Sequence, residues 1–165
     1  MCWGQGSNGR LGTGNSFQQT TPTFTASLGT DRYAKQVVQG GGHGCAVIDD
    51  GTVKCWGSGI STGTGGTSDV FTPTTTDSLG AGRTAHALIA GTGHVCAILD
   101  DATMTCWGHG GLGRLGNGAT DNQLSPVPVI TTGVPQYWQV SDFLVDPDNR
   151  DCLLYTSPSP RDNTL

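Results

Sequence analysis

Residues 43–57 read His-Gly-Cys-Ala-Val-Ile-Asp-Asp-Gly-Thr-Val-Lys-Cys-Trp-Gly. This stretch returns as residues 94–108, His-Val-Cys-Ala-Ile-Leu-Asp-Asp-Ala-Thr-Met-Thr-Cys-Trp-Gly. A third Cys-Trp-Gly triplet stands at residues 2–4. Prolines and glycines keep nearly the same spacing, at Pro22, Pro73, Pro126, Gly29, Gly80 and Gly133. Self-similarity at a fixed period is the signature of a repeat architecture, so the sequence predicts repeats of 51 to 53 residues.

Each repeat contains four short runs that favour β-strands. In the middle copy they are residues 36–39, 43–48 and 52–56, and a proline-headed, threonine-rich run at 73–79 that corresponds to 22–28 in the first copy. β-Branched and aromatic residues favour strands, and Asp- and Gly-rich stretches between them mark turns. Four short strands per repeat of this length are typical of a propeller blade. The predicted fold class is all-β, with β-propeller blades of four short antiparallel strands.

The period divides the chain into units. We expect a partial repeat at 1–31, repeats at 32–82 and 83–135, and the start of a further repeat at 136–150. Eight Lys and Arg against thirteen Asp and Glu, with a pI near 5.0, argue against a nucleic-acid partner. No apolar run approaches the ~18 residues of a membrane helix, so we expect no membrane insertion.

The cysteines at 45, 55, 96 and 106 are disulfide candidates if the turn between them has three residues. A loop of residues 49–51 with Gly51 left-handed sets Cys45 directly opposite Cys55, at a distance that suits a disulfide. A two-residue Asp-Gly turn instead puts the two cysteines on opposite faces. In the next copy Ala102 replaces Gly51. A left-handed alanine costs on the order of 1 kcal/mol, so we expect that hairpin to be weaker or shaped differently.

Two alternatives stay open for the same cysteines. They are free buried thiols, or a zinc site in which His43 joins Cys45 and Cys55, and His94 joins Cys96 and Cys106. Zinc sites usually show Cys-x-x-Cys spacing, which the sequence lacks. We expect no metal and no cofactor.

These residues resemble the regulator of chromosome condensation repeat family, whose members form seven-bladed β-propellers. The family pattern has Gly and His before the second strand, an Asp-Gly turn and a Trp-Gly end to the third strand, as in residues 37–57. It also has a Gly-x-Leu-Gly element, present at 9–12 and 113–116. The likeness covers residues 1–135. The middle copy has 63–66 without the leucine, so we expect that loop to be degenerate.

The resemblance implies a fragment of about three of seven blades, with structural repeat markers at His43, His94, Trp3, Trp56, Trp107 and Gly51. The histidines match a structural position of the family. Each tryptophan is expected in the core, because a large aromatic that recurs once per blade fills the space between sheets.

The C-terminal segment differs in character from the repeats. Residues from about 151, including 152–162, resemble translated sequencing-adapter read-through; the alternative is a native Ser/Pro-rich disordered tail. We therefore leave Cys152 out of the cysteine pairing, and Cys2 has no hairpin mate in the chain.

No catalytic constellation stands out. The Asp pairs at 49–50 and 100–101 have the form of paired carboxylates, but Asp in a turn accepts local backbone hydrogen bonds, and we favour that role. The sequence therefore indicates a non-enzymatic propeller module that binds a protein partner through its loops and is a monomer when full length.

Two other functions remain as alternatives. One is guanine-nucleotide exchange or regulation of a small GTPase; the other is a secreted enzyme inhibitor or adhesin. Oxidised cysteines favour an extracellular or cell-surface location, and reduced ones a cytoplasmic or nuclear location.

Overall fold

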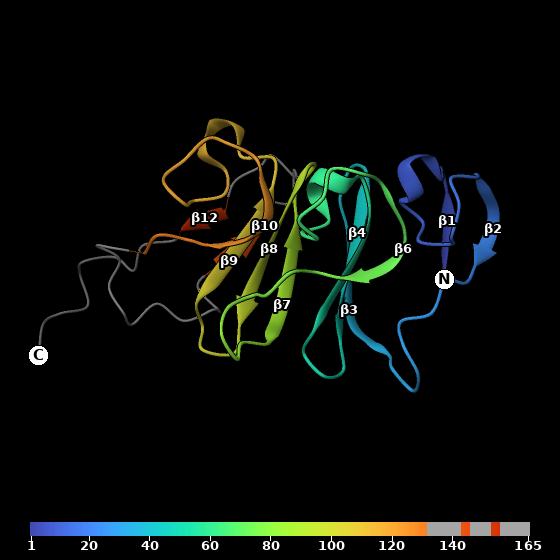
Figure 1. Cartoon of the computed structure of the whole chain (residues 1–165), viewed down its shortest axis with the longest axis horizontal. Coiled ribbons are helices and arrows are strands. Elements are labelled where there is room, and N and C mark those ends of the chain that lie inside the picture. Colours follow the sequence, from blue (N-terminus) through green and yellow to red (C-terminus); the bar gives the residue numbers. More distant parts are fainter. Residues whose placement is uncertain (132–142, 146–152, 156–165) are drawn as a thin grey trace, which may run out of the picture.

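A series of antiparallel sheets lies side by side along the chain (Figure 1). The computed structural model describes residues 1–131, 143–145 and 153–155. The first four-stranded sheet has its strands in chain order: β3 (Ala34–Gln39), β4 (His43–Ile48), β5 (Val53–Gly57) and β6 (Val70–Thr75). The second repeats this order with β7 (Ala85–Ala90), β8 (His94–Leu99), β9 (Met104–Gly108) and β10 (Gln123–Pro128). The predicted all-β fold with four-stranded blades is confirmed.

A third, two-stranded sheet stands at the N-terminal side. It pairs β1 (Cys2–Gly4) with β2 (Gln19–Thr23), which correspond in sequence to the third and fourth strands of a full blade. The chain therefore contains about three blades. Beyond residue 131 the structure describes β11 (Phe143–Val145) paired with β12 (Leu153–Tyr155). Apart from these two strands, the expected further repeat at 136–150 and the expected tail from 151 lie outside the described residues.

Short 3₁₀ helices connect the third strand of each blade to the fourth. They are η1 (Ser7–Gly9), η2 (Gly59–Ser61) and η3 (Gly111–Gly113). They lie at one end of the blades, and the β4–β5 and β8–β9 hairpins lie at the other (Figure 1). We call these the helical end and the hairpin end. In the described ranges no helix is long and apolar enough to cross a membrane.

The fourth strand of each blade begins earlier than predicted. The sequence placed the proline at its head, but Pro73 is the fourth residue of β6, and β2 and β10 likewise start before their prolines. Proline has no backbone N–H to donate and is tolerated on an edge strand or at a bulge. β6 is such an edge strand, and its register with β5 shifts between Cys55 and Gly57.

The core lies between neighbouring blades. Trp107 of the third blade is fully buried against strands of the second, in a cluster with Val47, Val53, Leu88 and Val95. Trp56 is buried with Ile48 and Leu28 at the preceding junction. Trp3, also expected in the core, is 62% exposed instead.

The connection after β5 is more regular than the sequence predicts. Its loop at 63–66 was expected to be degenerate because it lacks the family's leucine. Instead η2 forms, and Thr62 takes the buried place that Leu11 and Leu115 hold in the other copies. The Thr62 hydroxyl donates to the Gly59 carbonyl at 2.8 Å. A small side chain with a satisfied hydroxyl therefore substitutes for leucine.

Candidate functional site

The β4–β5 hairpin closes through a three-residue loop. The Ile48 amide donates to the Thr52 carbonyl at 2.9 Å, the Gly51 amide donates back to the Ile48 carbonyl at 2.9 Å, and Gly51 has a φ of +81°. The resulting register puts Cys45 opposite Cys55, with Cα atoms 4.1 Å apart, and a disulfide joins them.

The β8–β9 hairpin has the same shape although it lacks the glycine. Ala102 adopts a left-handed φ of +62°, and its amide donates to the Leu99 carbonyl at 3.0 Å. Cys96 and Cys106 are again cross-strand partners joined by a disulfide, with Cα atoms 4.1 Å apart. The expectation of a different shape is wrong. The cost of the alanine is therefore carried as backbone strain.

The paired aspartates hold the loops in place. Asp49 accepts from Arg32 Nη1 at 2.9 Å and from the Tyr33 amide at 3.2 Å. Asp50 accepts from the Thr52 hydroxyl at 2.7 Å and lies 3.3 Å from Arg32 Nη2. The Thr52 hydrogen bonds, together with the charge of Arg32, hold the pKa of Asp50 below its usual range.

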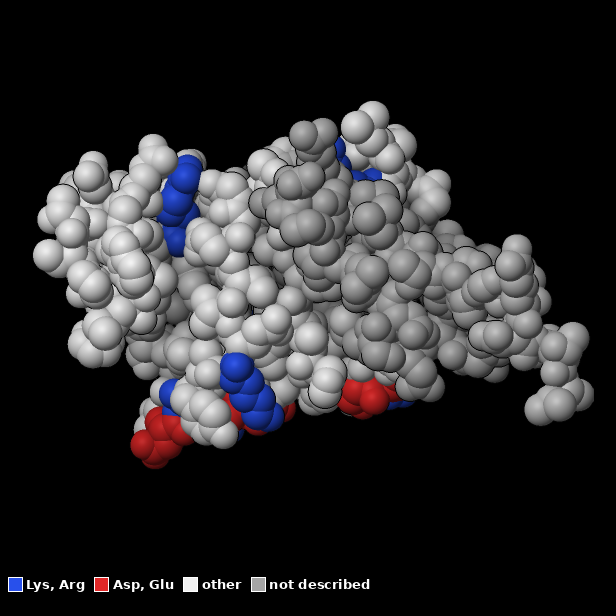
Figure 2. Space-filling model, turned by 180° about the vertical axis from the view of Figure 1, so that it is seen from behind, with Lys and Arg blue, Asp and Glu red and all other residues white. Residues whose placement is uncertain are grey.

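The same arrangement recurs in the next blade. Arg83 pairs with Asp100 at 3.2 Å and with Asp101 at 3.1 Å, and Asp101 accepts from the Thr103 hydroxyl. Each cluster contains one guanidinium between two carboxylates, and its members are partly exposed. Figure 2 shows charged side chains of both signs gathered along one edge, which is the hairpin end.

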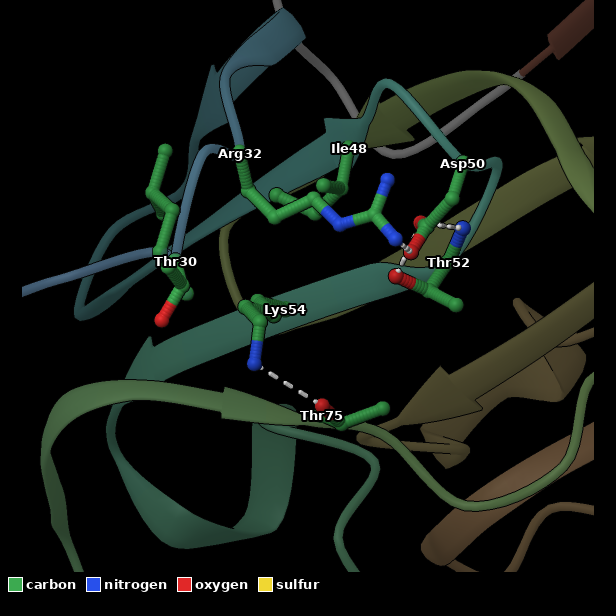
Figure 3. Close-up of a pocket in the computed structure, with 9 residues that line it drawn as sticks. Thr30, Arg32, Ile48, Asp50, Thr52, Lys54 and Thr75 are labelled. Atoms are coloured by element: carbon green, nitrogen blue, oxygen red, sulfur yellow. Dashed lines mark hydrogen bonds and ion pairs between the residues drawn. The ribbon is translucent and has the colours of Figure 1, made fainter.

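A cavity of about 270 Å³ opens beside the first cluster. It is lined by the segment before β3, by the end of the hairpin and by β6, with the residues Leu28, Gly29, Thr30, Arg32, Ile48, Asp50, Thr52, Lys54 and Thr75. In Figure 3 Arg32 reaches toward Asp50, and Lys54 points toward Thr75. Thr30 lies at the left of the view, on the side away from Asp50. Lys54 Nζ donates to the Thr75 hydroxyl at 3.0 Å.

The two repeat histidines lie together at the junction between blades. His43 is 1% exposed and His94 is 9% exposed. Burial lowers the pKa of His43 to about 4, and the nearby charges of His94 and His109 act in the same direction. Within the part of the chain that the structure describes, no three His, Cys, Asp or Glu side chains are grouped to hold a metal ion.

Other contacts of this region were missed by the sequence analysis. The Trp56 indole donates to the Arg10 carbonyl at 3.0 Å, and the Trp107 indole donates to the Ser61 carbonyl at 3.1 Å. The Gln36 side chain donates to the Leu88 carbonyl and accepts from its amide. No motif marks these pairs; the recurrence of the tryptophans was the available signal for the first two.

Comparison with known proteins extends the picture. Residues 2–47 match the family model for the regulator of chromosome condensation (RCC1) repeat. The probable E3 ubiquitin-protein ligase HERC4 of Rattus norvegicus is 30% identical over 133 residues, 79% of this chain and 12% of that protein. The human E3 ubiquitin-protein ligase HERC2 is 32% identical over 126 residues, 74% of this chain and 3% of that protein. Because the chain spans so little of these relatives, their ligase activity is not carried over to it.

Solved structures support the same fold. Prp20p of Saccharomyces cerevisiae, described with its binding to Gsp1p and histones, superposes with a TM-score of 0.71 at 18% identity, covering 86% of this chain and 35% of its own. Human WBSCR16 gives a TM-score of 0.62 at 20% identity, over 78% of this chain and 34% of its own. The repeated sequence, the four-stranded blades and these matches agree: the chain carries a match to the RCC1 repeat family model and folds as consecutive β-propeller blades.

Proposed function

We propose that the chain is a non-enzymatic propeller module that binds a protein partner through the hairpin end of its blades. The observation that carries this is the pair of Arg–Asp clusters, which occupy the same place in two consecutive blades. Each cluster fixes a loop by hydrogen bonds and ion pairs, so the polar groups that face solvent are held in a rigid array. Preorganised surfaces bind with less loss of side-chain freedom.

The relatives give this proposal its partner class. Prp20p is described as binding Gsp1p and histones, and the same protein, yeast RCC1 (Prp20), has been solved bound to Kap60. These are protein partners of that protein. In this chain the partner would meet surface loops on a rigid scaffold, which is where binding residues are commonly placed.

A photo-cross-linking experiment tests which end of the blades binds. Tyr33, which is 62% exposed beside Asp49, is replaced by benzoylphenylalanine. Phe17, which is 71% exposed and whose backbone carbonyl lies beside Gly6 at the start of η1, is replaced in a matched control. We expect irradiation in an extract of the source to give a discrete adduct from position 33 that an excess of the unlabelled chain removes. No adduct, or equal adducts from both positions, would contradict the proposal.

The exchange-factor alternative draws on the fold shared with Prp20p, which binds Gsp1p. Its measurement is the release of a labelled guanine nucleotide from a purified small GTPase. Acceleration by this chain would replace the binding-module proposal, whereas unchanged release leaves it in place.

The location is tied to the two disulfides. Thiols are kept reduced in the cytosol and nucleus, so differential alkylation of the protein in its source cells separates the locations. The relatives found give no support to an extracellular protein; the disulfides are the observation that favours an oxidising compartment. Reduced cysteines in the cell would remove the secreted inhibitor or adhesin from consideration.

A further inference from the structure

We propose that the cavity beside Lys54 binds a glutamate side chain of the partner protein, with the lysine ammonium pairing its carboxylate. The inference rests on the proposed function, since it names a chemical group that the partner presents. The cavity adjoins the first Arg–Asp cluster at the hairpin end, so a protein docked there would cover it.

Lys54 is a cation whose ammonium group still has hydrogen-bond donors available for a ligand. Its Nζ donates a hydrogen bond to the Thr75 hydroxyl at 3.0 Å. Among the described residues, the ion pairs of this blade join Arg32 to Asp49 and Asp50, and Lys54 takes part in none. An ammonium group has three donors, so two remain for a ligand. A carboxylate is the group that pairs with it most strongly.

The rest of the lining fits the remainder of a glutamate. The Thr75 hydroxyl accepts from Lys54, which leaves its own proton to donate to a carboxylate. The half-buried Leu28 lines the same cavity, and its carbon atoms can contact the two methylene groups of the stem. Aspartate has one methylene fewer and would reach Lys54 with less of this contact.

The charges around the cavity determine on which side an anion would bind. Arg32 Nη2 lies 3.3 Å from Asp50, but Arg32 also pairs with Asp49, so the cluster keeps one net negative charge and repels an incoming anion. Figure 3 shows Arg32 and Asp50 at one side and Lys54 at the other. An anion is therefore drawn toward the lysine.

The feature belongs to one blade and is not required by the repeat. The cross-strand pair Lys54 and Thr75 corresponds in the next blade to Thr105 and Pro128, which are again cross-strand partners. Thr105 is 2% exposed, and neither residue carries a charge. Two blades thus fold alike with and without the lysine, so its presence is free to serve recognition.

The sequence contains two lysines, Lys35 and Lys54, which makes a direct test available. The full chain is labelled with ¹³C at lysine Cε and titrated with the acetylated, amidated peptide Gly-Gly-Glu-Gly-Gly. We expect the Lys54 signal to move and saturate while the Lys35 signal stays. We expect the variant Lys54→Gln to bind the peptide roughly tenfold more weakly by the amide shift of Thr75, and the matched control Lys35→Gln to bind as the unaltered chain does.

Three results would overturn the inference. They are equal movement of both lysine signals, an equal effect of the peptide with Gln in place of Glu, and an equal effect of acetate, which would make this a site for free anions. The test is separable from that of the proposed function. If the glutamate peptide fails to bind while the Tyr33 cross-link persists, the glutamate inference falls and the binding module stands. If the peptide binds and no Tyr33 adduct forms, the glutamate site in the cavity stands and the binding-module proposal falls.

Discussion

Ala102 holds a backbone conformation that glycine holds in the preceding blade. Its φ of +62° matches the +81° of Gly51, but L-residues in this region pay roughly 1–2 kcal/mol that glycine does not. Replacing alanine by glycine also loosens the unfolded chain, which offsets part of the gain. We expect Ala102→Gly to raise the free energy of unfolding by about 0.5 kcal/mol, measured by chemical denaturation.

The reverse change is the matched control. A Cβ on Gly51 would lie 2.6 Å from Cβ of Thr84 in the next blade, so Gly51→Ala adds a clash to the strain. It should lower the free energy of unfolding by about 2 kcal/mol or more. If both changes raised the free energy of unfolding, or both lowered it, the two loops would not be equivalent.

His43 makes the blade junction sensitive to acid. Its folded-state pKa is about 4 because of burial, against about 6.5 in an unfolded chain. Between these values the unfolded state binds more protons, so stability is present above pH 6.5 and is lost as the pH falls toward 4. The full loss is on the order of 3 kcal/mol.

The variant His43→Gln removes this titration. We expect its free energy of unfolding to change less between pH 7 and pH 4 than that of the unaltered chain. His86→Gln, at an exposed histidine of β7, is the control and should keep the original pH dependence. An unchanged slope in His43→Gln would assign the acid sensitivity to other groups.

Among the secondary-structure elements, Trp56 and Trp107 each join their own blade to the loop of the preceding one. The Trp107 indole reaches the Ser61 carbonyl in buried surroundings, and a buried acceptor left without its donor costs about 1–3 kcal/mol. We expect Trp107→Phe to lower the free energy of unfolding by about 2 kcal/mol. Trp3→Phe makes the same chemical change at a 62% exposed position and should alter stability by less than about 0.5 kcal/mol. Equal losses would mean that the indole bond contributes little.

The strands and hairpins were predictable because their signals are local. Residues 49–51 contain a turn whose length sets the cysteine register, and that register appears in both hairpins. The start of β6 was missed because an edge strand tolerates a proline that a central strand would exclude. Thr62 was missed because a hydroxyl satisfied inside its own loop can occupy an apolar position, and hydrophobic pattern does not show this.

Across the whole molecule, the repeat period of the sequence predicts the number of blades but not the contacts between neighbouring blades. Trp107 meets Ser61 46 positions earlier, and Gln36 meets Leu88 52 positions later; these offsets join different places in the repeat. The cavity differs in kind, because Lys54 and Thr75 belong to one blade and meet through the pairing of β5 with β6. Contacts between copies depend on how blades stack, which no single repeat encodes.

Gln36 tests whether neighbouring blades behave as one unit. Its side chain accepts from the Leu88 amide at 2.7 Å and donates to the Leu88 carbonyl at 3.0 Å, so it acts as a partner strand for the edge of β7. We expect Gln36→Ala to speed hydrogen exchange at the Leu88 amide, because that amide loses its acceptor while the amides bonded within the β7–β8 ladder keep theirs. Gln39→Ala, at an exposed residue of the same strand, should leave Leu88 protected. Faster exchange throughout β7–β10 in Gln36→Ala would mean instead that this clamp controls the opening of the whole third blade, and unchanged exchange at Leu88 would contradict its role as the link between blades.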